Sequence, residues 1–292
     1  MATHVAAKTW HRQFSRVRIL VFIIVWSAVV VVAGCTQTKA SRSTVEAKPT
    51  PAPVASLTPG LPDQAERITP NWPNYFTFTE YSIPSLSFEK DGYDLQAQYP
   101  QISSRKPEAR RFNRWIKKRV LGYAQLFDRL AAAQQRRKHK QLPTLWGLDL
   151  HYVVYYSNER LVSLRLTHSL METGQMHPIA YYETINFDLK KGRPLRDKDV
   201  FKHGYLKSFS TYSRKHLLDH YVIPNDYWLN GGTEPRVKNF TNWNIVPEGV
   251  LLSFEDYQVS SHSFGQPEFV VPFSAMNGTI QQHVLRTLVV SQ

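Results

Sequence analysis

The segment LDLHYVVYYSNERLVSLRLTHSL (residues 148–170) carries the clearest pattern in this 292-residue chain. Residues at alternate positions are apolar in two successive runs, and four polar residues (157–160) separate the runs. Leu148, Leu150, Tyr152, Val154 and Tyr156 share one face of the first run. A period of two is that of a β-strand with one buried face. The segment therefore predicts two consecutive antiparallel strands.

A third run, IAYYETINFDLKKG (residues 179–192), continues the same alternation. The positions expected to face the core in the second and third runs are Val162, Leu164, Leu166, Leu170, Ile179, Tyr181, Ile185, Phe187 and Leu189. Polar residues occupy the opposite positions, namely Ser163, Arg165, Thr167, Ser169, Thr184, Asn186 and Asp188. This pattern predicts a three-stranded antiparallel meander with one face in contact with solvent.

A long amphipathic helix is predicted upstream of the meander, over residues 107–140. Pro107 and Glu108 suit its first turn. One face is apolar (Phe112, Trp115, Ile116, Val120, Tyr123, Ala124, Phe127, Leu130, Ala131), and basic residues lie opposite. Strands are predicted at residues 75–83 and 86–99, the latter with a turn at Asp91-Gly92, and at residues 249–259 and 267–273, with a helix at 205–221. The predicted class is α+β, with antiparallel sheets packed against helices.

The N-terminal 35 residues read as an export signal. Residues 1–18 are basic, residues 19–32 are apolar apart from Ser27, and Ala33-Gly34-Cys35 follow. The apolar run is short for a membrane-spanning helix. Val32-Ala33-Gly34-Cys35 resembles the lipobox of bacterial lipoproteins, which implies cleavage between Gly34 and Cys35 and lipidation of Cys35. An ordinary cleaved signal peptide and an uncleaved anchor helix remain the alternatives.

Four segments follow from these patterns. Residues 1–34 are expected to form the signal peptide, and residues 35–72 a flexible linker rich in Pro, Ala, Ser and Thr. Residues 73–142 and 143–292 are expected to form two α+β modules. Lipid anchoring would place the chain in the cell envelope, facing the periplasm or the extracellular side.

The chain is strongly basic, with a formal net charge of +13. This balance favours anionic partners such as phosphate-rich polymers or acidic lipid head groups, although a solvated charged face gives the same composition. Export argues against nucleic acid, and the sequence lacks the aromatic motif of an RNA-binding sheet. Expected partners are the membrane, through the lipid, and peptidoglycan, an anionic envelope polymer or another envelope protein.

Few residues suggest chemistry. The sequence has no Gly-x-Ser-x-Gly, His-Glu-x-x-His or phosphate-binding glycine loop. His216 and His220 have a spacing that suits a metal, but no third ligand is identifiable, and a helix surface is the alternative. A turn at Glu172-Thr173 would pair Leu164 with Tyr181, Leu166 with Ile179, and His168 with His177. The two histidines would then form a polar pair with a structural role, or a binding site. No cofactor or metal is expected.

Three stretches carry a resemblance to a known family. IPSLSFEKDGYDLQAQYPQIS (residues 83–103) resembles the N-terminal module of PdaC-like bacterial proteins. MHPIAYYETINFDLKKGRPLRDKDVF (residues 176–201) and GVLLSFEDYQVSSHSFGQPEFVVPFSAM (residues 249–276) resemble their companion, RsiV-like domain. The resemblance implies an α+β envelope domain that is not itself a known enzyme, and it provides no catalytic residue to carry over.

Together these observations predict a lipid-anchored, non-catalytic envelope protein that binds a cell-wall polymer or an envelope protein. The alternative is a small envelope hydrolase, or an inhibitor of a cell-wall hydrolase. A hydrolase would gather titratable groups in one pocket. Glu172, His177, His168 and Asp188 are the residues that such a pocket would bring together.

Overall fold

The computed structural model describes residues 72–83, 93–137, 146–171, 177–221, 223 and 226–286. These residues lie in the compact unit formed by Pro62–Gln292. The expected signal peptide, the lipidation site at Cys35, nearly all of the linker and the Asp91-Gly92 turn lie outside the described residues.

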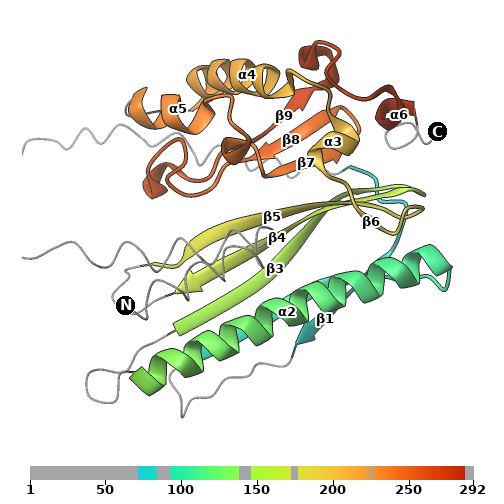
Figure 1. The fold of residues 1–292 in the computed structure, drawn as a ribbon, viewed down its shortest axis with the longest axis vertical. Helices are drawn as coiled ribbons and strands as arrows, with labels where there is room; N and C mark the ends of the chain where they lie inside the picture. The colour runs from blue at the N-terminus through green and yellow to red at the C-terminus, as the bar shows by residue number, and fades with distance from the viewer. Residues whose placement is uncertain are drawn as a thin grey trace, which may run out of the picture. The chain divides into compact units, whose positions relative to one another are not determined.

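The larger sheet has six strands in chain order (Figure 1). They are β1 (Phe78–Ile83), β2 (Tyr93–Ile102), β3 (Trp146–Ser157), β4 (Leu161–Met171), β5 (Ile179–Asp188) and β6 (Arg193–Pro194). The meander of β3, β4 and β5 is antiparallel, as the alternation predicts. Only β2 and β3 are parallel among these pairs, because a helix connects them and returns the chain to the same end of the sheet. This pair joins the segments on either side of residue 142 in one sheet.

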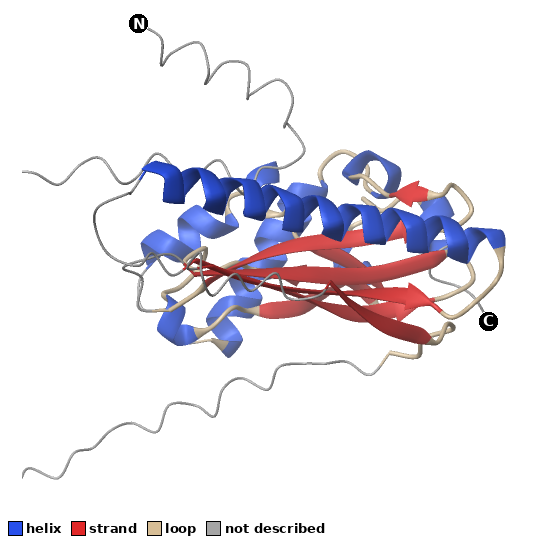
Figure 2. Ribbon diagram, turned by 90° about the horizontal axis from the view of Figure 1, so that it is seen from below, coloured by secondary structure: helices blue, strands red, loops and turns tan. Residues whose placement is uncertain are grey.

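The connecting helix, α2 (Pro107–Arg137), covers one face of the six-stranded sheet (Figure 2). Its expected apolar face is buried at Phe112, Ile116, Val120 and Phe127. The Phe112 ring meets Phe187 of β5 edge-on, with 5.3 Å between the ring centroids. Within the described part of the chain, no helix combines the length and apolarity needed to cross a membrane.

A second sheet lies against the other face of the first one (Figure 1). It consists of β7 (Trp243–Val246), β8 (Gly249–Ser253) and β9 (Glu268–Pro272), all antiparallel. Helices α4 (Tyr205–His220) and α5 (Asp226–Thr233) lie beyond it. The described layers are therefore helix, sheet, sheet and helix. The short elements are α3 (Asp197–Val200), η1 (Val237–Asn239), η2 (His262–Phe264), η3 (Phe273–Met276) and α6 (Gln282–Val284).

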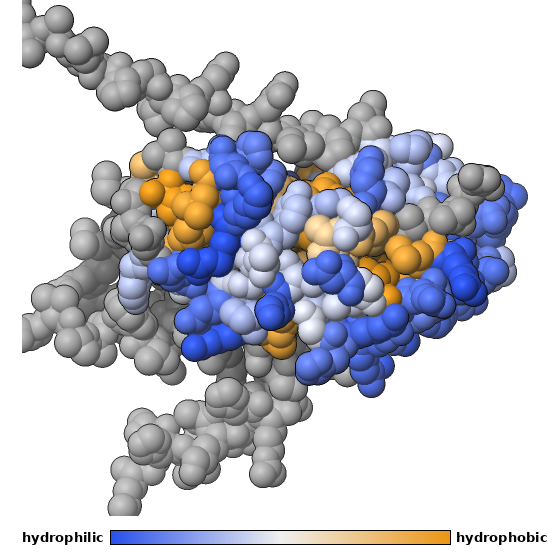
Figure 3. Space-filling model, turned by 90° about the horizontal axis from the view of Figure 1, so that it is seen from above, coloured by the Kyte–Doolittle hydropathy of each residue, from blue (hydrophilic) through white to orange (hydrophobic). Residues whose placement is uncertain are grey.

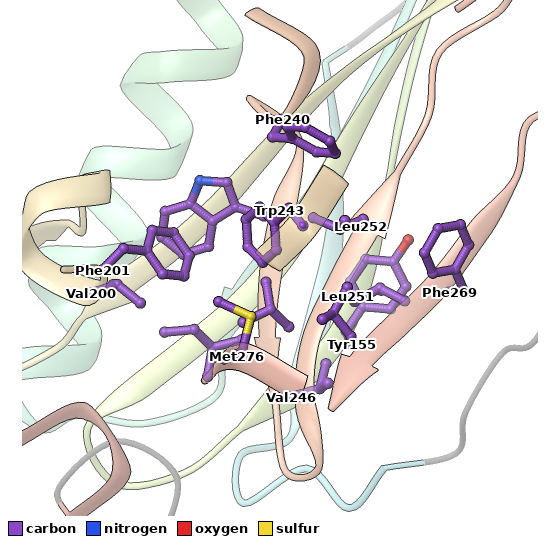
Figure 4. Packing of buried hydrophobic residues seen from close by; sticks show 14 of the residues in the cluster. Tyr155, Val200, Phe201, Phe240, Trp243, Val246, Leu251, Leu252, Phe269 and Met276 are labelled. Atoms are coloured by element: carbon purple, nitrogen blue, oxygen red, sulfur yellow. The ribbon is translucent and has the colours of Figure 1, made fainter. Parts of the chain in front are cut away.

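The hydrophobic core of this second half lies around the three-stranded sheet (Figure 4). Phe201, just after α3, meets Trp243 of β7 edge-on, with 4.8 Å between the ring centroids. The Trp243 indole N–H donates to Asp197 at 3.0 Å, and the Tyr205 hydroxyl donates to the same carboxylate at 2.8 Å. Asp197 thus fixes α3 and the start of α4 on the sheet.

An ion pair holds the turn before α3. Arg193 donates two hydrogen bonds to Asp199, at 2.8 and 2.9 Å. The hydrogen bonds from Arg193 hold the pKa of the Asp199 carboxyl well below its ordinary value, although partial burial acts in the opposite direction. The segment GRPLRDKDVF (residues 192–201) is therefore stabilised by an ion pair between two of its own residues.

The expectation of a solvated sheet face is wrong. The residues expected to face solvent, including Ser163, Thr167, Asn186 and Asp188, are buried, because the second sheet covers them. Asn244 of β7, itself fully buried, donates to the Ser163 hydroxyl at 3.0 Å and to the Leu164 carbonyl at 2.9 Å. Buried polar side chains are tolerated where their hydrogen bonds are made, and Ser163 and Asn186 bond to groups of the second sheet.

Asn186 lies at the centre of this junction between the sheets. Its side-chain amide donates to the Trp243 carbonyl at 2.9 Å, while its oxygen accepts from the Ile245 N–H at 2.7 Å and the Ser163 hydroxyl at 3.0 Å. A salt bridge adds to the junction, since Arg165 of β4 lies 2.8 Å from Glu268 of β9. One asparagine therefore satisfies buried groups of both sheets.

We expect Asn186→Ala to lower the free energy of unfolding by at least about 2 kcal/mol, because three buried groups lose a partner at roughly 1–3 kcal/mol each. Urea unfolding followed by circular dichroism measures this change. Asn230→Ala, on the exposed side of α5, is the matched control and should stay within about 0.5 kcal/mol of the parent. Equal stability of the two variants would contradict the role given to Asn186.

Candidate functional site

The outer edge of β5 sets the position of the candidate site. Among the described strands, only β6 pairs with that edge, and it does so only at Phe187 and Asp188. Farther along, the Ala180 N–H donates to the Asp256 carboxylate at 3.3 Å, and the Tyr182 N–H donates to Glu255 at 3.2 Å. Two side chains thus take the place of a neighbouring strand, which satisfies an edge that would otherwise invite pairing. They also fix the chain between β8 and β9, residues 254–267, against β5.

Glu255 is enclosed by this arrangement. Besides the Tyr182 N–H, it accepts a hydrogen bond from the Asn242 amide at 3.0 Å. Burial raises the pKa of the Glu255 carboxyl above its ordinary value, because it disfavours the ionised form, and the two hydrogen bonds offset this only in part. Ionisation of the Glu255 carboxyl is therefore disfavoured in the folded protein.

Gln258 holds the same loop from its other side. Its amide donates to the Gly232 carbonyl at 3.2 Å and to the Asn239 carbonyl at 2.8 Å, at the end of α5 and in η1. The two chains approach closely here: a Cβ atom at Gly232 would lie 2.1 Å from the Gln258 carbonyl oxygen. Any side chain at position 232 would displace the loop.

Tyr257 lies between these two anchored residues and adopts a left-handed backbone, with φ of 62°. Such a conformation is unfavourable for a bulky side chain and persists where surrounding contacts impose it. Tyr257 is 46% exposed. Trp228 of α5 meets it edge-on, with 6.1 Å between the ring centroids. The left-handed residue therefore carries an aromatic side chain that is partly exposed to solvent.

Two histidines complete the site. The rings of His177 and His262 are stacked, with 3.9 Å between centroids and 8° between planes. His262 Nδ1 lies 3.1 Å from Asp256, and the Tyr257 hydroxyl lies 3.5 Å from His177 Nε2. We call His177, Tyr257 and His262, with Asp256 beneath them, the loop platform.

The loop platform brings aromatic and hydrogen-bonding groups together. It combines a flat exposed ring with polar atoms that donate or accept hydrogen bonds, on a rigid base. No group of three or more His, Cys, Asp or Glu residues in the described ranges is placed to hold a metal. Figure 3 views the side that carries α4 and α5, where hydrophilic surface surrounds separate apolar areas.

The predicted pairing of His168 with His177 is wrong. In the structure, Leu164 pairs with Ile185, Leu166 with Glu183 and His168 with Tyr181, so each partner lies four residues later than predicted. The reason is the connection between β4 and β5, which extends from residue 172 to residue 178 in place of a tight turn. His177 consequently lies outside the strand and contacts the β8–β9 loop.

His168 belongs to a different cluster, buried between the sheet and α2. The Tyr123 hydroxyl donates to Glu183 at 2.6 Å, Arg119 pairs with Glu183 at 2.6 Å, and His168 lies 3.8 Å from the same carboxylate. Burial favours the neutral acid, but the interactions with His168 and then Arg119 outweigh it and hold the pKa of Glu183 below its ordinary value. This cluster attaches α2 to β5.

The remaining candidates are not brought together. His177 precedes β5 and Asp188 ends it, so roughly 30 Å of strand separates them. Glu172 lies outside the described residues. His216 packs against Phe269, with 4.2 Å between ring centroids, and burial lowers its pKa.

Sequence reasoning missed Tyr257, His262 and Asp256, and the polar interruption after the 249–253 strand was the signal that could have revealed them.

We expect Glu255→Gln to become progressively more stable relative to the parent as the pH rises above 4.5, the ordinary pKa of this group. A raised pKa in the folded state means that folding is favoured by protonation, so the ionised carboxyl costs stability at higher pH. Thermal unfolding of both proteins between pH 4 and 8 measures this difference. A difference that does not vary with pH would contradict the assignment.

Comparison with known protein families finds a match in the C-terminal part of the chain. Residues 198–274 match a protein family of unknown function, DUF3298. This range runs from α3 to just after β9 and includes Asp256, Tyr257 and His262.

The chain also shows partial similarity to individual proteins. The chain is similar to the peptidoglycan-N-acetylmuramic acid deacetylase PdaC of Bacillus subtilis, with 24% identity over 142 residues, which cover 44% of this chain and 30% of that protein. Crystal structures of DUF3298 proteins from Bacteroides fragilis (TM-score 0.47, 17% identity, 73% of this chain and 98% of that one) and Pseudomonas aeruginosa (TM-score 0.44, 18% identity, 72% and 94%) also match. On the family match alone, a DUF3298 domain is present in this chain at residues 198–274.

Proposed function

We propose that this chain is a non-catalytic, lipid-anchored protein of the bacterial cell envelope whose loop platform binds the glycan of the cell wall. The observation that carries the proposal is the exposed Tyr257 ring, which is held in a left-handed backbone beside the paired histidines and Asp256. Similarity to a protein named for its action on peptidoglycan supports the choice of polymer.

The platform suits a sugar for a physical reason. A sugar ring offers an apolar face of C–H groups and a rim of hydroxyls, so its sites combine an aromatic ring with hydrogen-bonding side chains. Tyr257 supplies the ring, and the two imidazoles supply polar atoms around it. The anchored loop loses little conformational entropy on binding, because Asp256, Glu255 and Gln258 already hold it.

The loop platform is proposed to bind the glycan without catalysing a reaction on it. The alignment covers less than a third of the deacetylase, so the activity of that whole protein is not carried over to this chain. The titratable groups of the platform pair with one another and with the backbone of β5. They thus act as supports for the aromatic ring.

We expect Cys35→Ser to abolish acylation of the chain produced in a bacterium, because the thiol is the proposed site of acylation; two or three acyl chains make anchoring durable. Fractionation of the envelope and intact-mass analysis measure this. The parent chain should start at Cys35 and carry the mass of the acyl groups. A parent chain with an unmodified thiol and residues 1–34 still attached would contradict the anchor.

We expect Tyr257→Asn to weaken binding to purified peptidoglycan at least about tenfold, which corresponds to about 1.4 kcal/mol. Asparagine tolerates the left-handed backbone, so the change removes the ring without adding strain. Co-sedimentation with insoluble peptidoglycan measures the dissociation constant.

Tyr81→Asn is the matched control, because Tyr81 is 45% exposed and lies on β1, at the opposite edge of the six-stranded sheet from β5. It should bind as the parent chain does. Equal binding by the Tyr257 variant, the Tyr81 variant and the parent would contradict the platform as the site. Absence of binding by the folded parent would contradict the function itself.

A further inference from the structure

The outer face of α2 carries a stripe of basic side chains that the loop platform does not use. We call it the basic stripe. It consists of Arg105 and Lys106, just before the helix, and of Arg110, Arg114, Lys117 and Lys118 of α2, all exposed. The last four recur at three- and four-residue steps and so lie along one side of about 12 Å of helix. Figure 2 shows α2 on the outside of the sheet, and no described element covers its outer side.

These charges have no compensation within the described protein. None of the six side chains forms an ion pair there, whereas the neighbouring basic residues do: Arg111 lies 3.8 Å from Glu108, and Arg119 pairs with Glu183. Like charges four residues apart, as at Arg110 and Arg114, destabilise a helix. Arg110 also lies near the positive end of the helix dipole, where a cation is unfavourable. Repulsion within the basic stripe therefore lowers the stability of the isolated molecule. Binding of an anionic partner would offset this repulsion.

The shape of the stripe favours a flat partner. It lies on a convex helix surface, and no large apolar side chain is exposed among its residues. The apolar face of α2, including Phe112 and Ile116, is buried against the sheet, so the helix has no face left to insert into lipid. A helix of this kind adsorbs on phosphate head groups through charge alone.

We propose that the basic stripe docks the folded domain on an anionic lipid bilayer, with α2 lying flat on its phosphate head groups. Each basic side chain near such a surface strengthens binding about fivefold. Docking through α2 leaves the loop platform free, because the platform lies at the outer edge of β5 and includes no residue of α2. The inference draws on the proposed function only for the identity of the membrane that holds the anchor.

Lysine footprinting of the full chain tests the docking. The protein is mixed with vesicles of phosphatidylcholine alone or with about one third phosphatidylglycerol, then acetylated with a water-soluble reagent and analysed by mass spectrometry. We expect Lys117 and Lys118 to react at least about fivefold more slowly on the anionic vesicles, and about 0.5 M salt to remove the protection. Lys207 of α4 and Lys238 of η1 should react equally on both.

Charge-reversal variants sharpen the test. Arg114→Glu, Lys117→Glu and Lys118→Glu together should abolish the protection of Lys106. The control, Lys202→Glu, Lys207→Glu and Lys238→Glu, makes the same change of net charge on exposed residues beyond the other face of the six-stranded sheet and should leave it intact.

Two results would overturn the docking. Equal labelling of Lys117 and Lys118 on both kinds of vesicle would show that no docking occurs. Equal protection of these lysines by soluble polyphosphate would identify a phosphate polymer as the partner instead of a bilayer. Association with the neutral vesicles reports the lipid anchor separately, so loss of the anchor and loss of docking are distinguishable.

Discussion

The structure depends on how the outer edge of β5 is satisfied. A strand edge carries N–H and C=O groups that must bond somewhere, and β6 reaches only the last two residues of β5. Asp256 and Glu255 take over at Ala180 and Tyr182. Because both carboxylates come from adjacent positions of one loop, the loop lies along the outer edge of β5. Tyr257 and His262 owe their positions to that constraint.

The same logic governs the junction between the two sheets. The polar face of β4 and β5 could be buried only against a layer that matches it, and Asn244 and Glu268 of the second sheet supply partners for Ser163 and Arg165. The apolar side of the second sheet then packs under α4 and α5. The frame that results carries the loop platform at one sheet edge and the basic stripe along α2, so the two proposed binding sites share no residue.

Much of the fold could be predicted from local pattern. The alternation in β3, β4 and β5 and the apolar face of α2 are properties of neighbouring residues, which period and composition reveal. β7 and α5 were missed, because a four-residue strand and an eight-residue helix are too short to show a period. The buried polar face and the shifted register of His168 depend on what lies across space and on a connection of seven residues. No sequence pattern near Tyr257 predicts its left-handed backbone, because contacts with residues distant in the sequence impose that conformation.

The most direct test of the account is a nuclear magnetic resonance titration of the isotopically labelled protein with a soluble peptidoglycan glycan fragment. If the edge of β5 builds a glycan site, the largest shifts in backbone amide resonances will occur at residues 177–182 and 255–266, with smaller ones at 226–230. Largest shifts along α2, or none at saturating fragment, would contradict it.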